Sequence, residues 1–452
     1  MTLLAMVIGL MAVLLFGGYI RDINYAMQTD FVRRSGHLQI QHKDYFQVGS
    51  GNPAAYGIAG YARVIDVVKH DPVMAAMLAV VTPTLQFGGI AGNFAAGVSR
   101  PVLVNGVVVE GQNRLREWND YDQRLIARRL SLTGTAPDAA VIGTGLARVL
   151  QLCSALGVPS CVANSAGNAD QGEALPDDIA ALAKSDRSTA TATAAAAAAP
   201  AQEQPRIEIL AANARGAPNV AGVNVVSAEF QGIKELDDVY VGLHLSQAQK
   251  LVFGAATPQV TAIALQLHHT SQMPEARLRL DDLLRTKLND EPLAIVDYET
   301  LNPFYGQTMG MFAAIFGFIS VLIGAIVLFT VTNTMGMAVV ERTAEIGTLR
   351  AIGLRRSAIR TMFVSEGIML GCAGAVLGTG AAFVMAWAVN QLGLSWIPPT
   401  WIEPVPLAVR LDGEYAMVAA NAVGLVVVAS LSSLLPAARA ARMNIVDALR
   451  HV

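Results

Sequence analysis

The stretch at residues 341–353 reads ERTAEIGTLRAIG, and it decides how the rest of the chain is interpreted. It is charged and amphipathic, and it lies between two long apolar runs at 308–340 and 361–390. Each run is longer than the roughly 20 apolar residues that a helix needs to cross a bilayer. A short basic loop between two membrane helices stays on the cytoplasmic side, because Lys and Arg are retained there. We therefore predict that residues 341–360 form a small cytoplasmic segment attached to two membrane helices.

The distribution of apolar residues predicts the fold class. Apolar residues make up 53% of the chain and charged residues 15%, but the apolar ones gather in four blocks. These blocks predict transmembrane helices at 1–20, 308–340, 361–390 and 415–435. The span at 21–307 is more polar and is long enough for one large or two small domains. The predicted fold is membrane α-helical, with four transmembrane helices and a large α+β domain inserted between helices 1 and 2.

The arginines set the predicted topology. Five of them lie in the 341–360 segment and three in the tail at 436–452, whereas the loop at 391–414 carries only Arg410. The two basic segments are therefore expected in the cytoplasm, and the loop and the 21–307 domain on the other side of the membrane. In a Gram-negative cell this describes a multi-pass protein of the inner (cytoplasmic) membrane with its large domain in the periplasm.

The first apolar block has no Lys or Arg before it, so the basic region of a signal peptide is missing. We expect a transmembrane anchor that either starts unusually early or lacks a basic cytoplasmic lead-in. The alternative is a cleaved signal peptide, which would leave three membrane helices.

The 21–307 domain contains both strand and helix patterns. Residues 35–42 alternate, with Leu38 and Ile40 on one face, and predict a strand. Residues 164–205 are rich in Ala, Ser, Thr and Asp and poor in large apolar residues, so we expect a surface insertion there. Further strands are expected at 102–110, 223–230, 239–245 and 293–298, and helices at 60–70, 143–156, 246–253 and 275–288.

The cysteines fit an exported domain. Cys153 and Cys161 are separated by a short stretch that contains a Gly-Val-Pro turn, so a local disulfide is possible in an oxidising compartment. Two free thiols are the alternative. Cys372 lies among glycines in a membrane block and is interpreted as a small packing residue.

Several classes of chemistry find no support in the sequence. The clustered histidines have no Cys or carboxylate near them at zinc-site spacing, so no metal site is expected. The chain lacks a Gly-x-Ser-x-Gly elbow and a P-loop, so no catalytic residue and no ATP site of its own are predicted. The net charge of −3 does not suggest nucleic-acid binding. The blocks at 308–340 and 416–438 carry no charged residue, which argues against a proton-coupled carrier.

Small residues recur in the second and third membrane helices at spacings that let helices approach closely. They could serve ordinary packing within the chain, or they could form a seam between two permeases. Membrane lipids would surround the remaining surface of the helices. The glycines concerned are Gly310, Gly317 and Gly324 in the second helix and Gly367, Gly371, Gly374 and Gly378 in the third.

The 341–353 stretch, followed by Ser365-Glu366-Gly367 and a glycine-rich helix, resembles the FtsX/MacB-type ABC transporter permeases, including the lipoprotein-releasing ones. The basic tail at 436–450 is similar to the C-terminal pattern of that family. Weaker resemblances lie at 140–147 and 231–238 in the polar domain. The insertion at 164–205 and the abrupt N-terminus depart from the family pattern.

The resemblance implies that two permeases, either two copies or two paralogues, pair in the membrane, and that two separate ATP-binding subunits bind below them. ATP and Mg would be held by those partners and not by this chain. Arg342 and Glu345 could pair across one helical turn, and Ile346, Leu349 and Ile352 would form the apolar contact face. The residues expected to contact the ATPase are Glu341, Arg342, Glu345, Ile346, Leu349, Arg350, Ile352, Arg355 and Arg356. The alternative is an amphipathic helix that lies on the membrane surface without a partner.

Three functions are compatible with this layout. The first is extraction of a lipoprotein or another lipid-anchored cargo from the inner membrane and its transfer to a periplasmic chaperone. The second is mechanotransmission in a tripartite efflux or secretion pump, where the exported domain drives a periplasmic adaptor. The third is a cell-envelope signalling scaffold that transports nothing.

Overall fold

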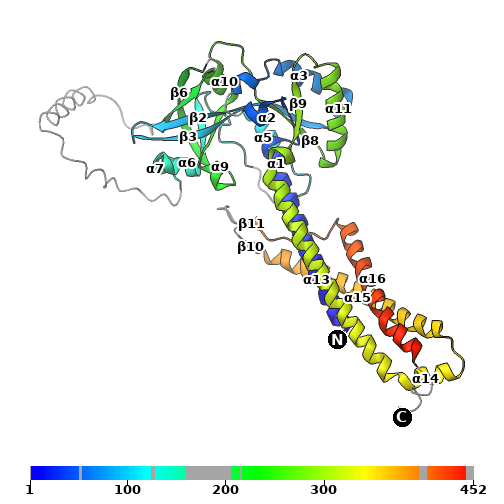
Figure 1. The fold of residues 1–452 in the computed structure, drawn as a ribbon. Coiled ribbons are helices and arrows are strands. Elements are labelled where there is room, and N and C mark those ends of the chain that lie inside the picture. The colour runs from blue at the N-terminus through cyan, green and yellow to red at the C-terminus, as the bar shows by residue number, and fades with distance from the viewer. Residues whose placement is uncertain are drawn as a thin grey trace, which may run out of the picture. The chain divides into compact units, whose positions relative to one another are not determined.

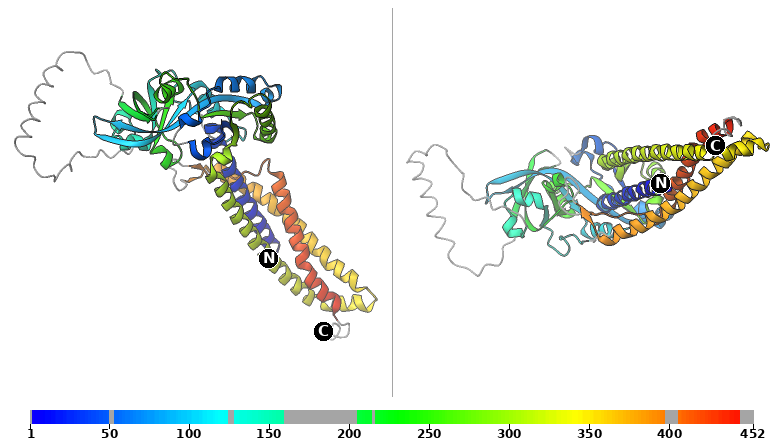
Figure 2. Two further views of the ribbon diagram at one scale, coloured as in Figure 1. Left: turned by 45° about the horizontal axis from the view of Figure 1, so that its top comes forward. Right: turned by 90° about the horizontal axis from the view of Figure 1, so that it is seen from below.

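The computed structural model describes residues 2–49, 53–123, 128–158, 205–213, 216–396 and 405–443. The chain divides into two compact units (Figures 1 and 2). The membrane unit comprises Met1–Arg34, Trp118–Leu125 and Asp297–Val452, and the sheet unit comprises Ser35–Glu117 and Ile126–Val296.

Four helices of the membrane unit are long and apolar enough to cross a membrane, as the four apolar blocks predict. They are α1 (Thr2–Ser35), α13 (Pro303–Glu341), α15 (Arg356–Leu392) and α16 (Tyr415–Arg442). Helix α13 is the yellow-green helix of Figure 1, and the short helix α14 (Thr343–Ala351) follows it. A further short helix, α12 (Tyr298–Leu301), precedes α13.

Helix α1 continues well past residue 20, where the sequence predicts its end. The polar residues after that point have partners inside the membrane unit. The side-chain amide of Gln28 donates to the Tyr298 hydroxyl at 2.8 Å, and Arg33 Nε donates to the Trp118 carbonyl at 2.6 Å. The Tyr25 ring stacks on Tyr121 with 4.2 Å between centroids. Because these contacts satisfy the polar side chains, the helix continues beyond the apolar block, and residues 118–123 belong to the membrane unit.

The sheet unit contains nine strands among the described residues, in the order β3-β7-β4-β6-β5-β2-β8-β1-β9. Strand β2 also pairs with β3, so the pairings from β2 through β3, β7, β4, β6 and β5 return to β2. The sheet is mixed, because β3–β7 and β4–β6 are parallel and the other pairs described are antiparallel. The strands are β1 (Leu38–His42), β2 (Leu78–Asn93), β3 (Val98–Val107), β4 (Ala139–Gly143), β5 (Arg206–Ala212), β6 (Pro218–Glu229), β7 (Tyr240–His244), β8 (Ala262–Leu267) and β9 (Leu293–Asp297).

Short helices pack on this sheet around one apolar core that includes Leu38, Ile40, Val104, Ile142 and Leu265. The helix predicted at 143–156 is in fact two helices, because Gln151 adopts a left-handed conformation with φ of 56° between them. The helices of this unit are α2 (Tyr45–Val48), η2 (Pro53–Tyr56), α3 (Tyr61–Lys69), α4 (Pro72–Met77), α5 (Val109–Glu117), α6 (Thr144–Val149), α7 (Cys153–Leu156), α9 (Lys234–Asp237), α10 (Leu245–Phe253), η3 (Thr270–Gln272) and α11 (Met273–Thr286).

Two features expected from the sequence lie outside the described residues. Cys161 is one of them, so the Cys153–Cys161 disulfide stays a prediction, with Cys153 at the start of α7. The other is the Ala-rich stretch, of which only Pro205 is described.

A buried carboxylate joins two helices of the sheet unit and gives its stability a pH dependence. Asp71 caps α4 by accepting from the backbone N–H groups of Val73 and Met74, and Arg279 of α11 donates to both of its oxygens. The hydrogen bonds from Arg279 lower the pKa of Asp71 to about 2. A lowered pKa means that the stabilisation is complete above the ordinary value near 4 and is lost as the pH falls from there toward 2.

We expect Asp71→Asn to lower the free energy of unfolding of the sheet unit by about 1–2 kcal/mol at pH 7, because the charge-assisted pair is lost. Urea unfolding of the full chain in detergent, followed at pH 7 and at pH 3, measures this. The difference between wild type and variant should shrink at pH 3. A difference that is equal at both pH values would contradict the role given to the Asp71 charge.

Candidate functional site

The segment 341–360 contains a short helix of its own between two membrane helices, while its residues from Arg356 on already belong to α15. Helix α13 ends at Glu341, Arg342 stands at the junction, and α14 runs from Thr343 to Ala351. The Thr343 hydroxyl lies 3.1 and 2.7 Å from the carbonyls of Val339 and Val340, so it caps the end of α13. Gly353 turns the chain into α15 with φ of 103°, a conformation that favours glycine.

One side of α14 is packed against the ends of the three neighbouring helices. Ile346 is 1% exposed and lies in an apolar cluster that we call the junction cluster. Ile359 and Phe363 contribute to it from α15, and both are fully buried. The complete junction cluster is Val339, Ile346, Ile359, Phe363, Ala437, Ala440 and Ala441. The junction cluster thus contains residues of α13, α14, α15 and α16.

Two polar contacts add to this packing. Arg350 Nη1 donates to the Ala441 carbonyl at 2.9 Å, in the last turn of α16, where helix carbonyls have no helical donor. Arg342 Nη1 lies 3.7 Å from Glu366 Oε2 of α15, so the two side chains form an ion pair. The predicted pair between Arg342 and Glu345 is therefore wrong among the described residues, because the ion-pair partner of Arg342 is Glu366 of a neighbouring helix.

The other side of α14 and the turn after it face away from the chain. Ile352 is 80% exposed, whereas Leu349 is half-buried. The predicted contact face of Ile346, Leu349 and Ile352 is thus wrong as a single surface, since residues six apart on a helix lie on different sides. The charged residues predicted for contact that remain exposed are Glu341, Arg342, Glu345, Arg355 and Arg356.

The four glycines of α15 that were predicted to pack closely lie against other helices of the same chain. A Cβ at Gly367 would meet Ser433 Cβ at 2.7 Å, and one at Gly371 would meet Ala429 Cβ at 3.0 Å, both in α16. A Cβ at Gly374 or Gly378 would meet Met6 or Leu10 of α1 at 3.0 and 3.1 Å. These glycines serve packing within the membrane unit.

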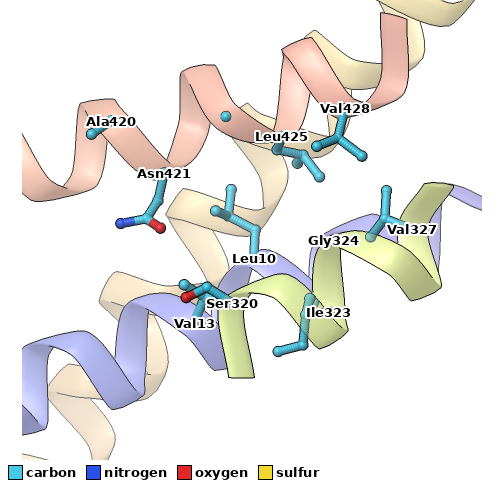
Figure 3. Close-up of a pocket in the computed structure, with 12 residues that line it drawn as sticks. Leu10, Val13, Ser320, Ile323, Gly324, Val327, Ala420, Asn421, Leu425 and Val428 are labelled. Carbon is cyan, nitrogen blue, oxygen red and sulfur yellow. The ribbon is translucent and has the colours of Figure 1, made fainter. Parts of the chain in front are cut away.

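The predicted seam glycines of α13 lack the close neighbours that the α15 glycines have. At Gly310, Gly317 and Gly324 an added Cβ would meet no atom of the described residues within 4 Å. These three positions follow a seven-residue spacing. Gly310 and Gly317 are exposed, whereas Gly324 is half-buried and lines a pocket between α1, α13 and α16 (Figure 3). The predicted seam between two permeases stays a proposal.

Helix α13 is also joined to α16 by a hydrogen bond that the sequence did not reveal. Pro436 lies inside α16 and has no N–H, so the Ser432 carbonyl four residues earlier lacks its helical donor. The Thr332 hydroxyl of α13 lies 3.2 Å from that carbonyl and donates to it. This contact explains how α16 continues past residue 435, its predicted end, to Arg442.

We expect Thr332→Val to destabilise the membrane unit by about 1 kcal/mol, because the Ser432 carbonyl loses its donor while the side-chain volume is kept. Thermal unfolding in detergent measures the change. Thr330→Val is the matched control, since the Thr330 hydroxyl bonds only its own helix at the Ile326 carbonyl. Equal melting temperatures for both variants would contradict the link between α13 and α16.

The two weaker sequence resemblances in the polar domain meet in the sheet unit. The Asp237 carboxylate is 1% exposed and accepts from the N–H groups of Thr144, Gly145 and Gln231 and from the Thr144 hydroxyl. The first residues of α6 are thereby fixed to the end of α9 and to Gln231 in the loop before it. This arrangement is a hydrogen-bond network that stabilises the fold. Among the described residues, no group of three or more His, Cys, Asp or Glu side chains could hold a metal ion.

Comparison with known proteins identifies the C-terminal part. Residues 315–445, which include α14, α15, α16 and most of α13, match the family described as FtsX-like permease C-terminal. The chain therefore carries an FtsX-like permease domain. The junction cluster, the exposed side of α14 and the Thr332 contact all lie within this FtsX-like permease domain.

Curated relatives agree with the FtsX-like assignment. The macrolide export ATP-binding/permease protein MacB of Hyphomonas neptunium is 28% identical over 52% of this chain and 34% of its own length. The uncharacterized ABC transporter permease YvrN of Bacillus subtilis is 30% identical over 42% of this chain and 44% of its own. The lipoprotein-releasing system transmembrane protein LolC of Neisseria meningitidis is 25% identical over 52% of this chain and 56% of its own. The matches thus span about a third to a half of these relatives.

A solved structure also aligns with the chain. The extracellular domain of the noncanonical ABC-type transporter YknZ from Gram-positive bacteria covers 58% of this chain and 99% of its own, at 14% identity. The TM-score of 0.28 is too low to establish a shared fold.

Proposed function

We propose that this chain is the membrane-spanning subunit of an ABC transporter, and that a separate ATP-binding subunit holds the exposed side of α14. The observation that carries the proposal is the construction of α14. Its buried side is fixed by Ile346 in the junction cluster and by the Arg350–Ala441 contact, while Ile352 is exposed beside Arg355 and Arg356. A helix that is held firmly on one side and open on the other is suited to pass force from a partner into the membrane helices.

In this proposal the chemistry takes place in the partner. The chain has no P-loop, so ATP and Mg would be bound by the ATP-binding subunit. Closure of two such subunits would push on α14, and the junction cluster would pass the movement to α13, which leads to the sheet unit. The exposed glycines Gly310 and Gly317 of α13 support pairing with a second permease, because glycines let two helix backbones approach closely.

We propose a lipid-anchored protein as the cargo, taken from the outer leaflet of the inner membrane, with the sheet unit in the periplasm. Two observations support this assignment. Residues 308–340 carry no charge, so α13 presents a surface that acyl chains can touch. The similarity to LolC, whose name refers to lipoprotein release, extends over 56% of that protein. Released cargo would then need a soluble periplasmic chaperone.

The similarity to MacB supports a second candidate, because the name of that protein refers to macrolide export. In that case the sheet unit would act on a periplasmic adaptor, and no cargo would pass between the membrane helices. The two candidates share the ATP-binding partner and differ in what touches the sheet unit.

Purification of the full chain in nanodiscs from native membranes, followed by mass spectrometry of bound proteins, tests the proposal. An ATP-binding subunit together with acylated proteins or their chaperone supports the first candidate. An ATP-binding subunit with an adaptor and an outer-membrane channel supports the second. If no ATP-binding subunit is recovered under conditions that preserve other transporter complexes, the proposal is wrong and α14 is a surface helix without a partner.

A further inference from the structure

An amide side chain lies exposed on the membrane-spanning part of α13. Asn333 belongs to the uncharged block at 308–340 and precedes Glu341, the last residue of α13, by eight residues, or about 12 Å of helix. The Asn333 side chain is exposed, and among the described residues it has no hydrogen-bond partner. Long Lys and Arg side chains can reach the membrane surface from within a helix, but Asn is too short to do so from this depth. The amide therefore needs a polar partner inside the membrane.

Large apolar side chains surround Asn333 on the same side of α13. Residues four and seven positions apart share one side of a helix. Phe329 and Met337 stand four positions before and after Asn333, and both are more than half exposed. Ile326 and Val340 stand seven positions before and after it and are also more than half exposed. We call these five residues the Asn333 face, an apolar surface with one amide at its centre.

The contacts of α13 with its own chain lie on the other side of the helix. Val327, Val331 and Met335 are buried in the apolar cluster that α13 shares with α1, α15 and α16. Val331 and Met335 are each two positions from Asn333, which corresponds to about 200° of rotation round a helix. Among the described residues, no neighbouring helix therefore covers the Asn333 face.

The chemistry of the amide selects what can cover this face. A carboxamide has two N–H donors and a carbonyl acceptor, so an identical carboxamide satisfies it in both directions. In a twofold-symmetric pair of chains the same surface patch of each copy meets its counterpart on the other. Lipid acyl chains offer neither donor nor acceptor, whereas Asn side chains hydrogen-bond across membrane helices. A single Asn in an apolar helix seam also fixes the register of the two helices.

We infer that the Asn333 face is the contact between α13 and the same helix of a second copy of this chain, and that the two Asn333 amides hydrogen-bond to each other there. The inference rests on the proposal that two permeases pair, and it names the second permease as another copy and not a paralogue. Gly317 is 16 positions from Asn333, about 160° round the helix, so it would face a different helix of that copy.

Cysteine crosslinking in liposomes tests the contact. The full chain, purified without an ATP-binding subunit, carries Cys372→Ser and is oxidised in vesicles of phosphatidylethanolamine and phosphatidylglycerol. We expect Asn333→Cys to form a covalent dimer with about fivefold the yield of Leu328→Cys, because only residues that approach closely can form a disulfide. Leu328 is the matched control, since it is also exposed but lies five positions away, about 140° round the helix.

A second measurement tests the amide itself. Copies that carry a donor or an acceptor dye are mixed in the same vesicles, and energy transfer is followed as the lipid content rises. Asn333→Leu should raise the dissociation constant of the pair about fivefold, because the hydrogen bonds between the helices are lost. Asn333→Gln keeps the donors and the acceptor and should retain most of the association. Equal dissociation constants for the wild type and the Leu variant would overturn the role of the amide.

The crosslinking experiment can also overturn the inference. Equal yields from Asn333→Cys and Leu328→Cys would mean random collisions in the bilayer. If Asn333→Cys gives no covalent dimer, the contact is wrong, and rapid reaction of that cysteine with a membrane-impermeant thiol reagent would show that residue 333 faces water. Both measurements use the chain alone. They can therefore fail while an ATP-binding subunit is still recovered from native membranes, and they can succeed when none is recovered.

Discussion

Gly143→Ala is expected to destabilise the sheet unit by about 3 kcal/mol or more, one of the two largest effects that we predict. A Cβ at this position would lie 1.9 Å from the backbone carbonyl oxygen of Asp237, a distance that no packing tolerates. The carbonyl cannot move away easily, because the Asp237 carboxylate is bonded to the N–H groups of Thr144 and Gly145 at 2.9 and 2.7 Å. The added methyl group could therefore be accommodated only by displacing a carbonyl group that a buried hydrogen-bond network holds in place.

Two variants make this prediction specific. Gly145→Ala should cost less, because its Cβ would lie closest to the movable carboxylate of Asp238, at 2.0 Å, while the nearest backbone atom, Asp238 Cα, is 3.2 Å away. Gly88→Ala in β2 should change stability by less than about 0.5 kcal/mol, because its Cβ would meet nothing within 4 Å among the described residues. Pulse proteolysis of the full chain in urea measures all three. A Gly143 variant as stable as the Gly88 variant would contradict the close approach between β4 and α9.

Ile346→Asp is the second substitution with a large expected effect. It places a carboxylate in the junction cluster, where Ile346 is 1% exposed, and we expect a loss of about 3–5 kcal/mol in the packing of α14. ATP hydrolysis by the partner should then no longer be coupled to the membrane helices. Ile346→Val should retain most of the function, because its smaller volume costs about 1 kcal/mol.

Ile352→Asp is the control that separates packing from partner binding. Ile352 is 80% exposed, so the membrane unit should remain as stable as the wild type, while binding of the ATP-binding subunit should weaken. The two variants are compared by melting temperature in detergent and by the amount of ATP-binding subunit retained on the purified chain. Equal melting temperatures for the Asp variants at 346 and 352 would contradict the division into a buried side of α14 and an exposed turn after it.

The membrane helices could be predicted from the sequence because their signal is long and continuous. Their ends could not, since they depend on tertiary contacts such as Gln28 with Tyr298 and Thr332 with the Ser432 carbonyl. Strand β8 is buried at every position and reads AIALQL, so it shows no alternation that would indicate a strand. Strand β5 does alternate between exposed and buried residues but is adjacent to the Ala-rich stretch, which obscured it.

Within the candidate site, the sequence predicted the segment but not the direction of each side chain. Arg350 was expected to contact a partner, yet it bonds the Ala441 carbonyl, which is 91 residues away in the chain. Ile346 was also expected to contact a partner, but it is buried against Phe363 and Ala437 from other helices of the chain. An amphipathic pattern shows that a helix has an apolar side, and only the fold decides whether that side faces the chain or a partner.

The measurement that tests the central claim most directly is a site-specific crosslink from the exposed turn that directly follows α14. A photoreactive amino acid is placed at Ile352, and separately at Phe329 in the membrane part of α13, in cells that express the full chain. We predict that Ile352 crosslinks to an ATP-binding subunit and that the yield changes when ATP is depleted, while Phe329 does not crosslink to that subunit. If Ile352 gives only lipid adducts, or the same products as Phe329, then α14 is not the contact between an ATPase and the membrane helices.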